Sequence, residues 1–131
     1  MAASTDDPAL EVLLLPLRDG VLRWPAPGRS VFLNARTGVA LQSARVAAPR
    51  CEQGFRPWAA ALQRDGFDVQ ADVEAADGSV PLVLVLAPRQ RQASRALLAR
   101  ALRLAADSGV VVACAANNAG ARSLQDDLAT L

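Results

Sequence analysis

Three polar turns in this chain carry side chains suited to binding an anion. Each follows a short apolar run: LNARTG follows SVF, APRQRQ follows LVLVL, and ANNAGARS follows VVVACA. Arginine suits this role because its planar guanidinium makes paired hydrogen bonds to phosphate or carboxylate. The turns therefore indicate a phosphate-bearing ligand such as RNA. The candidate binding residues are Asn34, Arg36, Arg89, Arg91, Asn117 and Arg122.

Ordinary turn chemistry is the alternative for the same residues. Asn34 and Asn117 can satisfy turn amides, and arginines at a helix start can simply face solvent. Arg122 lies beside a predicted helix start, where a positive charge opposes the helix dipole and so favours a carboxylate or external anion as partner. If the apolar runs are parallel strands, Asn34, Arg89 and Asn117 line one rim, because ligand clefts form at the carboxyl ends of such strands.

The composition excludes several kinds of chemistry. The chain has 131 residues and no histidine, which removes histidine bases, histidine-containing triads and histidine metal sites. With only Cys51 and Cys114, no disulfide framework is indicated, so we expect a cytoplasmic protein. The net charge of +1 signals no global attraction to nucleic acid. The longest clean apolar run, residues 82–87, is too short to span a bilayer, so no membrane contact is expected. Without histidine, no metal is expected either.

Helical and extended patterns alternate along the chain, which predicts one α/β domain over residues 1–131. Helices are expected at 8–15, capped by Asp7 and ended by Pro16, and at 57–64 and 89–106. A last helix begins with a capping box at Ser123–Asp126. Strands are expected at 31–34, 67–73, 81–87 and 109–117, and weaker extended patterns occur at 21–24 and around Val46.

Two side-chain placements follow from these helices. On the helix at 89–106, Leu98 and Leu104 share the apolar arc, whereas Arg100 falls on the opposite, polar arc. Phe55 and Trp58 are expected in the core between helix and sheet, with base stacking as the alternative role for Trp58.

The motifs that bind nucleotide cofactors are missing. Such α/β folds carry a glycine-rich turn after the first strand, and none of the eight glycines here forms one; the first strand leads into ARTGV, with Gly38 alone. After LVLVLA the chain reads PRQR, without the asparagine and aromatic residue that hold a base for amino methylation. No standard binding of S-adenosylmethionine, dinucleotide or ATP is therefore expected.

The segment from APRQRQ to the end resembles the N-terminal half of the bacterial small-subunit ribosomal RNA guanine-N2 methyltransferases. FLNAR and CEQGFRPWAAAL also look like family elements, so the resemblance covers roughly Ser30 to the end. One departure is the acidic residue of the family's first turn, which is Ala93 or Ser94 here. The matching residues are Pro88, Arg89 and Arg91 in that turn, and Gly109, Val110, Val112, Asn117, Gly120, Arg122 and Ser123 in a later run.

The resemblance implies a Rossmann-like, methyltransferase-like sheet flanked by helices, degenerate and truncated. In that family two related domains are joined: the C-terminal copy keeps the cofactor loop and catalyses, and the N-terminal copy helps to hold the catalytic domain and the rRNA. The chain would then bind no cofactor, be inactive alone, and act beside a catalytic domain that uses S-adenosylmethionine and is absent from residues 1–131. Two alternatives stay open: a small stand-alone methyltransferase with a non-standard cofactor site, and a structural, protein-binding α/β module.

Overall fold

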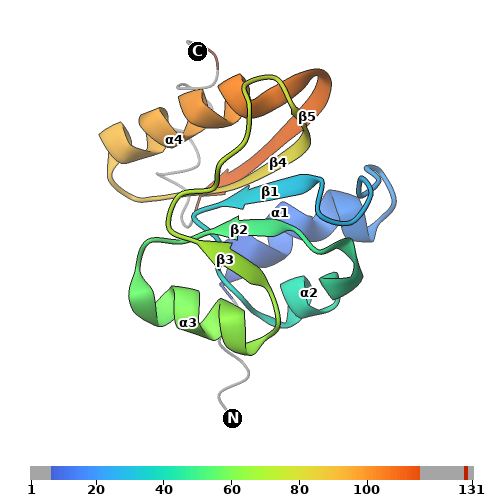
Figure 1. Ribbon diagram of the computed structural model, residues 1–131, viewed down its shortest axis with the longest axis vertical. Helices are drawn as coiled ribbons and strands as arrows, with labels where there is room; N and C mark the ends of the chain where they lie inside the picture. Colours follow the sequence, from blue (N-terminus) through green and yellow to red (C-terminus); the bar gives the residue numbers. More distant parts are fainter. Residues whose placement is uncertain (1–6, 116–128, 130–131) are drawn as a thin grey trace.

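The computed structural model describes residues 7–115 and residue 129 (Figure 1). Within them, five parallel strands form one sheet in the order β3-β2-β1-β4-β5, flanked by helices. This architecture confirms the predicted α/β, Rossmann-like fold. The strands are β1 (Ser30–Leu33), β2 (Arg50–Glu52), β3 (Asp68–Gln70), β4 (Val80–Ala87) and β5 (Ala105–Ala115). The helices are α1 (Pro8–Arg18), α2 (Val39–Gln42), α3 (Arg56–Arg64) and α4 (Arg91–Leu104), with a 3-10 turn, η2, at Arg45–Ala47.

Strand β4 lies between two apolar cores, one on each face of the sheet. Successive side chains of a strand point to opposite faces of the sheet. Leu82, Leu84 and Leu86 pack in the core with α1, α2 and α3, whereas Val83 and Val85 pack in the core with α4. Figure 1 shows α4 above the sheet and α2 and α3 below it. Because both faces are covered, this strand reads as a continuous apolar run.

The order of strands reverses between β1 and β4. The chain first builds outward from β1 to β2 and β3, and then returns to place β4 and β5 on the other side of β1. Leu33, the last residue of β1, pairs with Glu52 of β2 and Val85 of β4. Ligands of open parallel sheets bind outside the carboxyl ends of the strands at such a switch point. The candidate site is therefore sought at this edge.

Helix α1 begins as predicted but continues further. The Asp7 carboxylate accepts a hydrogen bond from the amide of Ala9 at 2.9 Å, as expected for a cap. The prediction that Pro16 ends the helix is wrong, because α1 continues to Arg18. An interior proline costs a helix about 3 kcal/mol, through one lost backbone hydrogen bond and a clash with the preceding turn. The burial of Leu17 in the core stabilises the last turn.

The weaker extended patterns were misassigned. Residues 21–24 form bends and irregular structure, and Val46 lies in η2 with 88% of its surface exposed. The strand of this region is β2, whose three residues are too few to show a periodicity. The helix predicted at 89–106 is α4, which ends at Leu104, and β5 begins at the next residue. The capping box at Ser123–Asp126 lies outside the described residues.

The connection from β3 to β4 is irregular where doubly wound sheets usually have a helix. Residues 71–79 cross the face of the sheet that α4 covers, and Val73 is buried in that core. The amide of Gly78 donates a hydrogen bond to the carbonyl of Arg103 at 2.8 Å. A segment without its own helix needs such contacts to stay in place. Within the described residues, none of the helices combines the length and apolar character required to cross a membrane.

Helix α3 is fixed to the segment after β1 through Asp65. The carboxylate of Asp65 accepts hydrogen bonds from the hydroxyl of Thr37 and, at 2.8 Å, from Nε2 of Gln42. These bonds lower the pKa of Asp65 below its ordinary value, because they favour the charged form. The turn that follows β1 and helix α3 therefore form one corner of the molecule.

Candidate functional site

Asn34 joins the two strands at the switch point. It follows β1 directly and has φ 56°, a left-handed conformation that asparagine tolerates better than most residues. Its Nδ2 donates a hydrogen bond to the carbonyl oxygen of Leu86 in β4 at 2.7 Å. The side chain thus bridges β1 and β4 at the edge where a ligand of such a sheet usually lies.

Gln53 extends this bridge to β2. Its Nε2 donates to the carbonyl of Ala35 at 2.8 Å and lies 3.4 Å from Oδ1 of Asn34. Its Oε1 accepts a hydrogen bond from the backbone amide of Phe55 at 2.9 Å. The backbone amide of Gln53 donates to the carbonyl of Gln70 at 2.9 Å. The side chain is buried, and its bonds hold the segments after β1 and β2 together.

Glu52 ends β2, where nucleotide-binding folds often place an acidic residue that contacts a ribose. Here both carboxylate oxygens accept hydrogen bonds from Arg100 of α4, and Oε1 also accepts one from the amide of Val73 at 2.9 Å. Nη2 of Arg100 donates to the carbonyl of Val73 at 2.8 Å and lies 3.1 Å from Oδ1 of Asp72. Glu52 therefore fastens the β3–β4 connection to α4.

Arg100 lies on the predicted polar arc of α4, but its side chain is only 24% exposed. Its guanidinium is drawn toward Glu52, and hydrogen bonding to that carboxylate raises the pKa of Arg100. The helical projection correctly placed Leu98 and Leu104 in the core. It did not show that the connection between β3 and β4 covers the flank of α4 on which Arg100 lies.

A shallow cavity of about 230 Å³ lies beside these residues. Pockets that enclose small molecules usually measure about 300–1,000 Å³. The cavity is therefore smaller than expected for a cofactor of nucleoside size. Its lining comes from the segments after β1, β2, β3 and β4 and from α4: Asn34, Glu52, Gln53, Gly54, Ala71, Pro88, Ala93 and Leu97.

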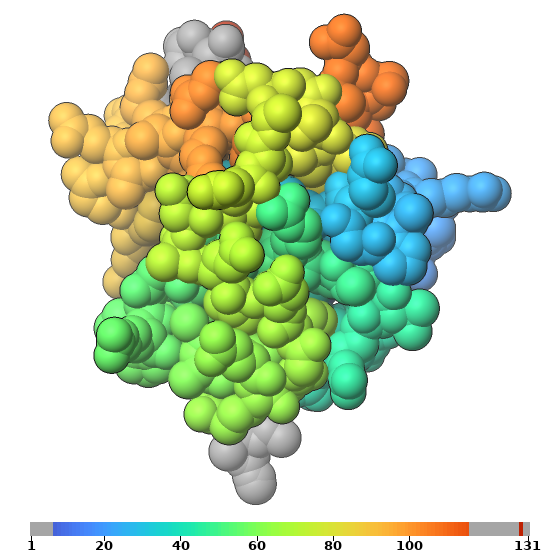
Figure 2. All heavy atoms as spheres, in the orientation of Figure 1, coloured from blue at the N-terminus to red at the C-terminus, as the bar shows by residue number. Residues whose placement is uncertain are grey.

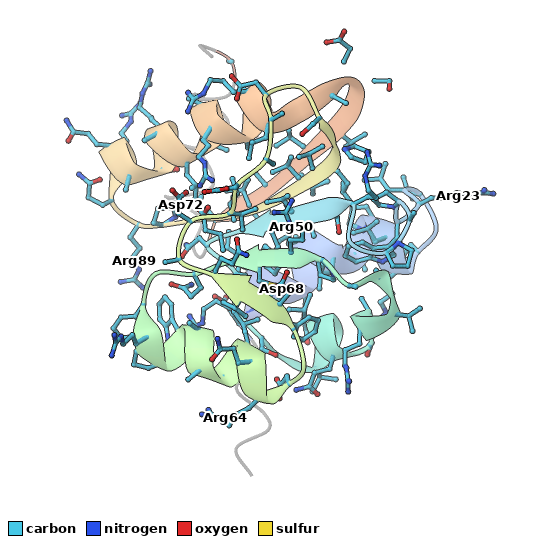
Figure 3. The ribbon with its side chains drawn as sticks, in the orientation of Figure 1. Arg23, Arg50, Arg64, Asp68, Asp72 and Arg89 are labelled. Atoms are coloured by element: carbon cyan, nitrogen blue, oxygen red, sulfur yellow. The ribbon has the colours of Figure 1, made fainter. Side chains whose placement is uncertain are left out.

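Four of the six predicted binding residues are described, and they lie near this edge. Asn34 lines the cavity, and Arg36 places its guanidinium carbon 3.7 Å from the ring centroid of Trp58. Arg89 and Arg91 are both exposed: Arg89 lies two residues before α4, and Arg91 is its first residue. Figure 3 shows Arg89 between the starts of α4 and α3. The two others, Asn117 and Arg122, lie outside the described residues.

The sequence reading missed Glu52 and Gln53, both in the segment CEQGF. The missed strand β2 explains this, because the position of an acidic residue at a strand end cannot be recognised without the strand. One signal was available: an acidic residue about 20 residues after the first strand is the spacing of a ribose-binding carboxylate in dinucleotide folds.

The two thiols are poor candidates for catalysis. Cys51 is fully buried in β2, and burial, with a smaller contribution from the Asp68 charge, raises its pKa to about 12. Burial also raises the pKa of Cys114. Thiol chemistry needs the thiolate, which a raised pKa disfavours. Among residues 7–115, no three histidine, cysteine or acidic side chains are clustered to hold a metal ion.

A second cavity has a different character. It measures about 690 Å³ and lies between α1, residues 24–27 and the α2–η2 segment. Its lining is mostly apolar and includes Trp24, Pro27 and Val39. An apolar recess of this kind is typical of contacts with protein rather than with phosphate.

Comparisons with protein-family models, curated proteins and solved structures found no match to this chain. The geometry of the sheet edge, together with the residues that carry the sequence resemblance, is therefore what supports a function.

Proposed function

We propose that this chain is the non-catalytic, Rossmann-like domain of a two-domain rRNA guanine-N2 methyltransferase that uses S-adenosylmethionine. In this role it supports the binding of rRNA and the catalytic domain. The observation that carries the proposal is that polar side chains at the switch point are hydrogen-bonded to other parts of the protein. Asn34 bridges β1 to β4 there, and Glu52 is bound by Arg100.

The backbone after β1 supports the same proposal. A cofactor loop lets its glycine amides approach the ligand, whereas the turn here is LNARTG, with Gly38 alone. Asn34 in this turn is committed to Leu86, and the neighbouring cavity is small. A domain that has these features and retains arginines at its edge is better suited to binding RNA than to methyl transfer.

Calorimetric titration with S-adenosylmethionine tests the cofactor part of the proposal. We expect no binding heat at ligand concentrations up to about 1 mM, a range that would reveal millimolar or tighter affinity. Saturable one-to-one binding would contradict the proposal and favour the stand-alone methyltransferase. The chain would then be assayed for methyl transfer. The Asn34→Asp variant would be assayed beside it, because a bound cofactor would have to displace the hydrogen bond from Asn34 to Leu86 of β4.

The RNA part is tested with a labelled fragment of small-subunit rRNA in fluorescence anisotropy. Changing Arg89, Arg91 and Arg122 together to glutamine should weaken binding and reduce the slope of log affinity against log salt by about 2, because each contact to single-stranded RNA contributes about 0.7. The matched control changes three exposed arginines outside this edge, Arg18, Arg23 and Arg29, to glutamine.

Equal losses in the two triple variants would indicate non-specific attraction and contradict the assigned edge. The absence of RNA binding by the wild-type chain would favour the protein-binding module. The apolar cavity beside Trp24 and Val39 is the observation that supports this second candidate.

A further inference from the structure

Phe55 and Trp58 form an exposed aromatic pair next to the candidate site. Their ring centroids are 4.9 Å apart and their planes meet at 75°. Phe55 is 53% exposed and Trp58 is 37% exposed, whereas Phe32 and Phe67 are 0% and 7% exposed. The prediction that Phe55 and Trp58 belong to the core is therefore wrong. Both lie at the start of α3, and the buried residue of that helix is Leu62.

Phe55 occupies a position where another residue would stabilise the helix better. It is the N-cap of α3, and its side chain makes no capping hydrogen bond. Serine, threonine, aspartate and asparagine are preferred at this position because their side chains accept a bond from a free amide of the first turn. The ring of Phe55 packs edge-to-face on Trp58 but stays 53% exposed and supplies no cap, a combination that is typical of a residue kept for binding.

Arg36 completes the group. It comes from the turn after β1 and stacks its guanidinium on the ring of Trp58, at 3.7 Å from the centroid. This distance is well within the range of a cation–π interaction. We call Arg36, Phe55 and Trp58 the aromatic platform.

Further positive charge flanks the aromatic platform. Arg56 is exposed directly after Phe55. Gly54 and Pro88 line the same shallow cavity, and Phe55 and Arg89 directly follow them in the chain, so both lie close to this cavity. Figure 2 shows the surfaces of the starts of α3 and α4 on the same side of the molecule. A ligand that stacks on Phe55 and carries negative charge would have the exposed Arg56 and Arg89 nearby.

We propose that the aromatic platform stacks an unpaired base of single-stranded RNA, whose phosphates contact Arg56 and Arg89. This inference rests on the proposed function and deepens it, because it names the form of RNA that the domain recognises. Aromatic rings stack on the faces of unpaired bases, and those faces are covered inside a duplex. Arginines beside the rings add the charge that follows the backbone.

The key variant is Phe55→Ser, because it should weaken binding without lowering stability. Serine is a favoured N-cap, and this gain offsets the lost ring contact with Trp58, so the melting temperature should stay close to that of the wild type. The affinity for a fluorescein-labelled single-stranded oligoribonucleotide should fall about 10- to 100-fold, since one stacking ring is lost. Phe55→Tyr keeps the ring and should bind like the wild type.

An abasic oligomer of the same length and charge separates stacking from charge. Wild type and Phe55→Ser should bind it equally weakly. In a Trp24→Phe background, where Trp58 is the only indole, the oligoribonucleotide should quench the fluorescence and the abasic oligomer should not.

The outcomes distinguish the platform from the wider proposal. If the wild type binds the oligoribonucleotide and Phe55→Ser binds it equally well, the platform is overturned and the RNA-binding role stands. If Phe55→Ser weakens binding of the abasic oligomer to the same extent, the contact is not stacking and the inference is likewise overturned. If the wild type binds neither oligomer nor the rRNA fragment, the RNA-binding role itself fails.

Discussion

Arg100→Ala should lower the free energy of unfolding by about 2–3 kcal/mol. The loss of one partner from a fully buried ion pair costs about 3–5 kcal/mol, and an exposed pair contributes at most about 1 kcal/mol. The side chains of Arg100 and Glu52 are 24% and 10% exposed, which places this pair between the two cases and nearer the buried one. The variant also leaves the carbonyl of Val73 without its bond from Arg100.

Urea unfolding of a double-mutant cycle measures this contribution. Glu52→Gln and Arg100→Ala are made singly and together, and the double variant should lose clearly less than the sum of the two single losses, because the two side chains interact directly. Arg103→Ala is the matched control: the same substitution on the same helix at an exposed position, where a change within about 0.5 kcal/mol is expected. Additive losses would show that the pair does not hold α4 to the β3–β4 connection.

Asn34→Ala should lower the free energy of unfolding by about 2–5 kcal/mol. Two effects add: the buried carbonyl of Leu86 loses its donor, at about 1–3 kcal/mol, and a residue with a Cβ and no local hydrogen bond is held at a left-handed φ, at about 1–2 kcal/mol. A loss of this size would show that the switch point stabilises the fold.

Asn34→Gly separates the two effects. Glycine adopts the observed φ of 56° without strain, so only the loss of the hydrogen bond remains, and Asn34→Gly should be less destabilised than Asn34→Ala. Asn34→Asp keeps the shape of the side chain but brings acceptors to the Leu86 carbonyl, and should be no more stable than Asn34→Gly. Equal stability of the alanine and glycine variants would contradict the contribution of backbone strain. Wild-type stability in all three would contradict the bridge.

The sequence determined the class of fold and its main elements. The apolar run that became β4 is long enough, and flanked clearly enough, to predict a strand buried on both faces, and Leu98 and Leu104 follow from helical spacing. The cap at Asp7 was also predictable, because capping depends on contacts within one turn. These features are local or repeat along the chain, so they can be recognised in one dimension.

The tertiary structure alone decided how the edge of the sheet is used. Glu52 and Arg100 are 48 residues apart, and Asn34 and Leu86 are 52 apart, so no local pattern connects them. The tertiary fold brings both pairs to one edge of the sheet. Arg100 there also donates to the carbonyl of Val73 in the β3–β4 connection. The exposure of Phe55 likewise depends on where α3 begins relative to the sheet. The sequence alone shows that no glycine-rich turn follows β1, whereas contacts between distant segments decided which residues occupy this edge of the sheet.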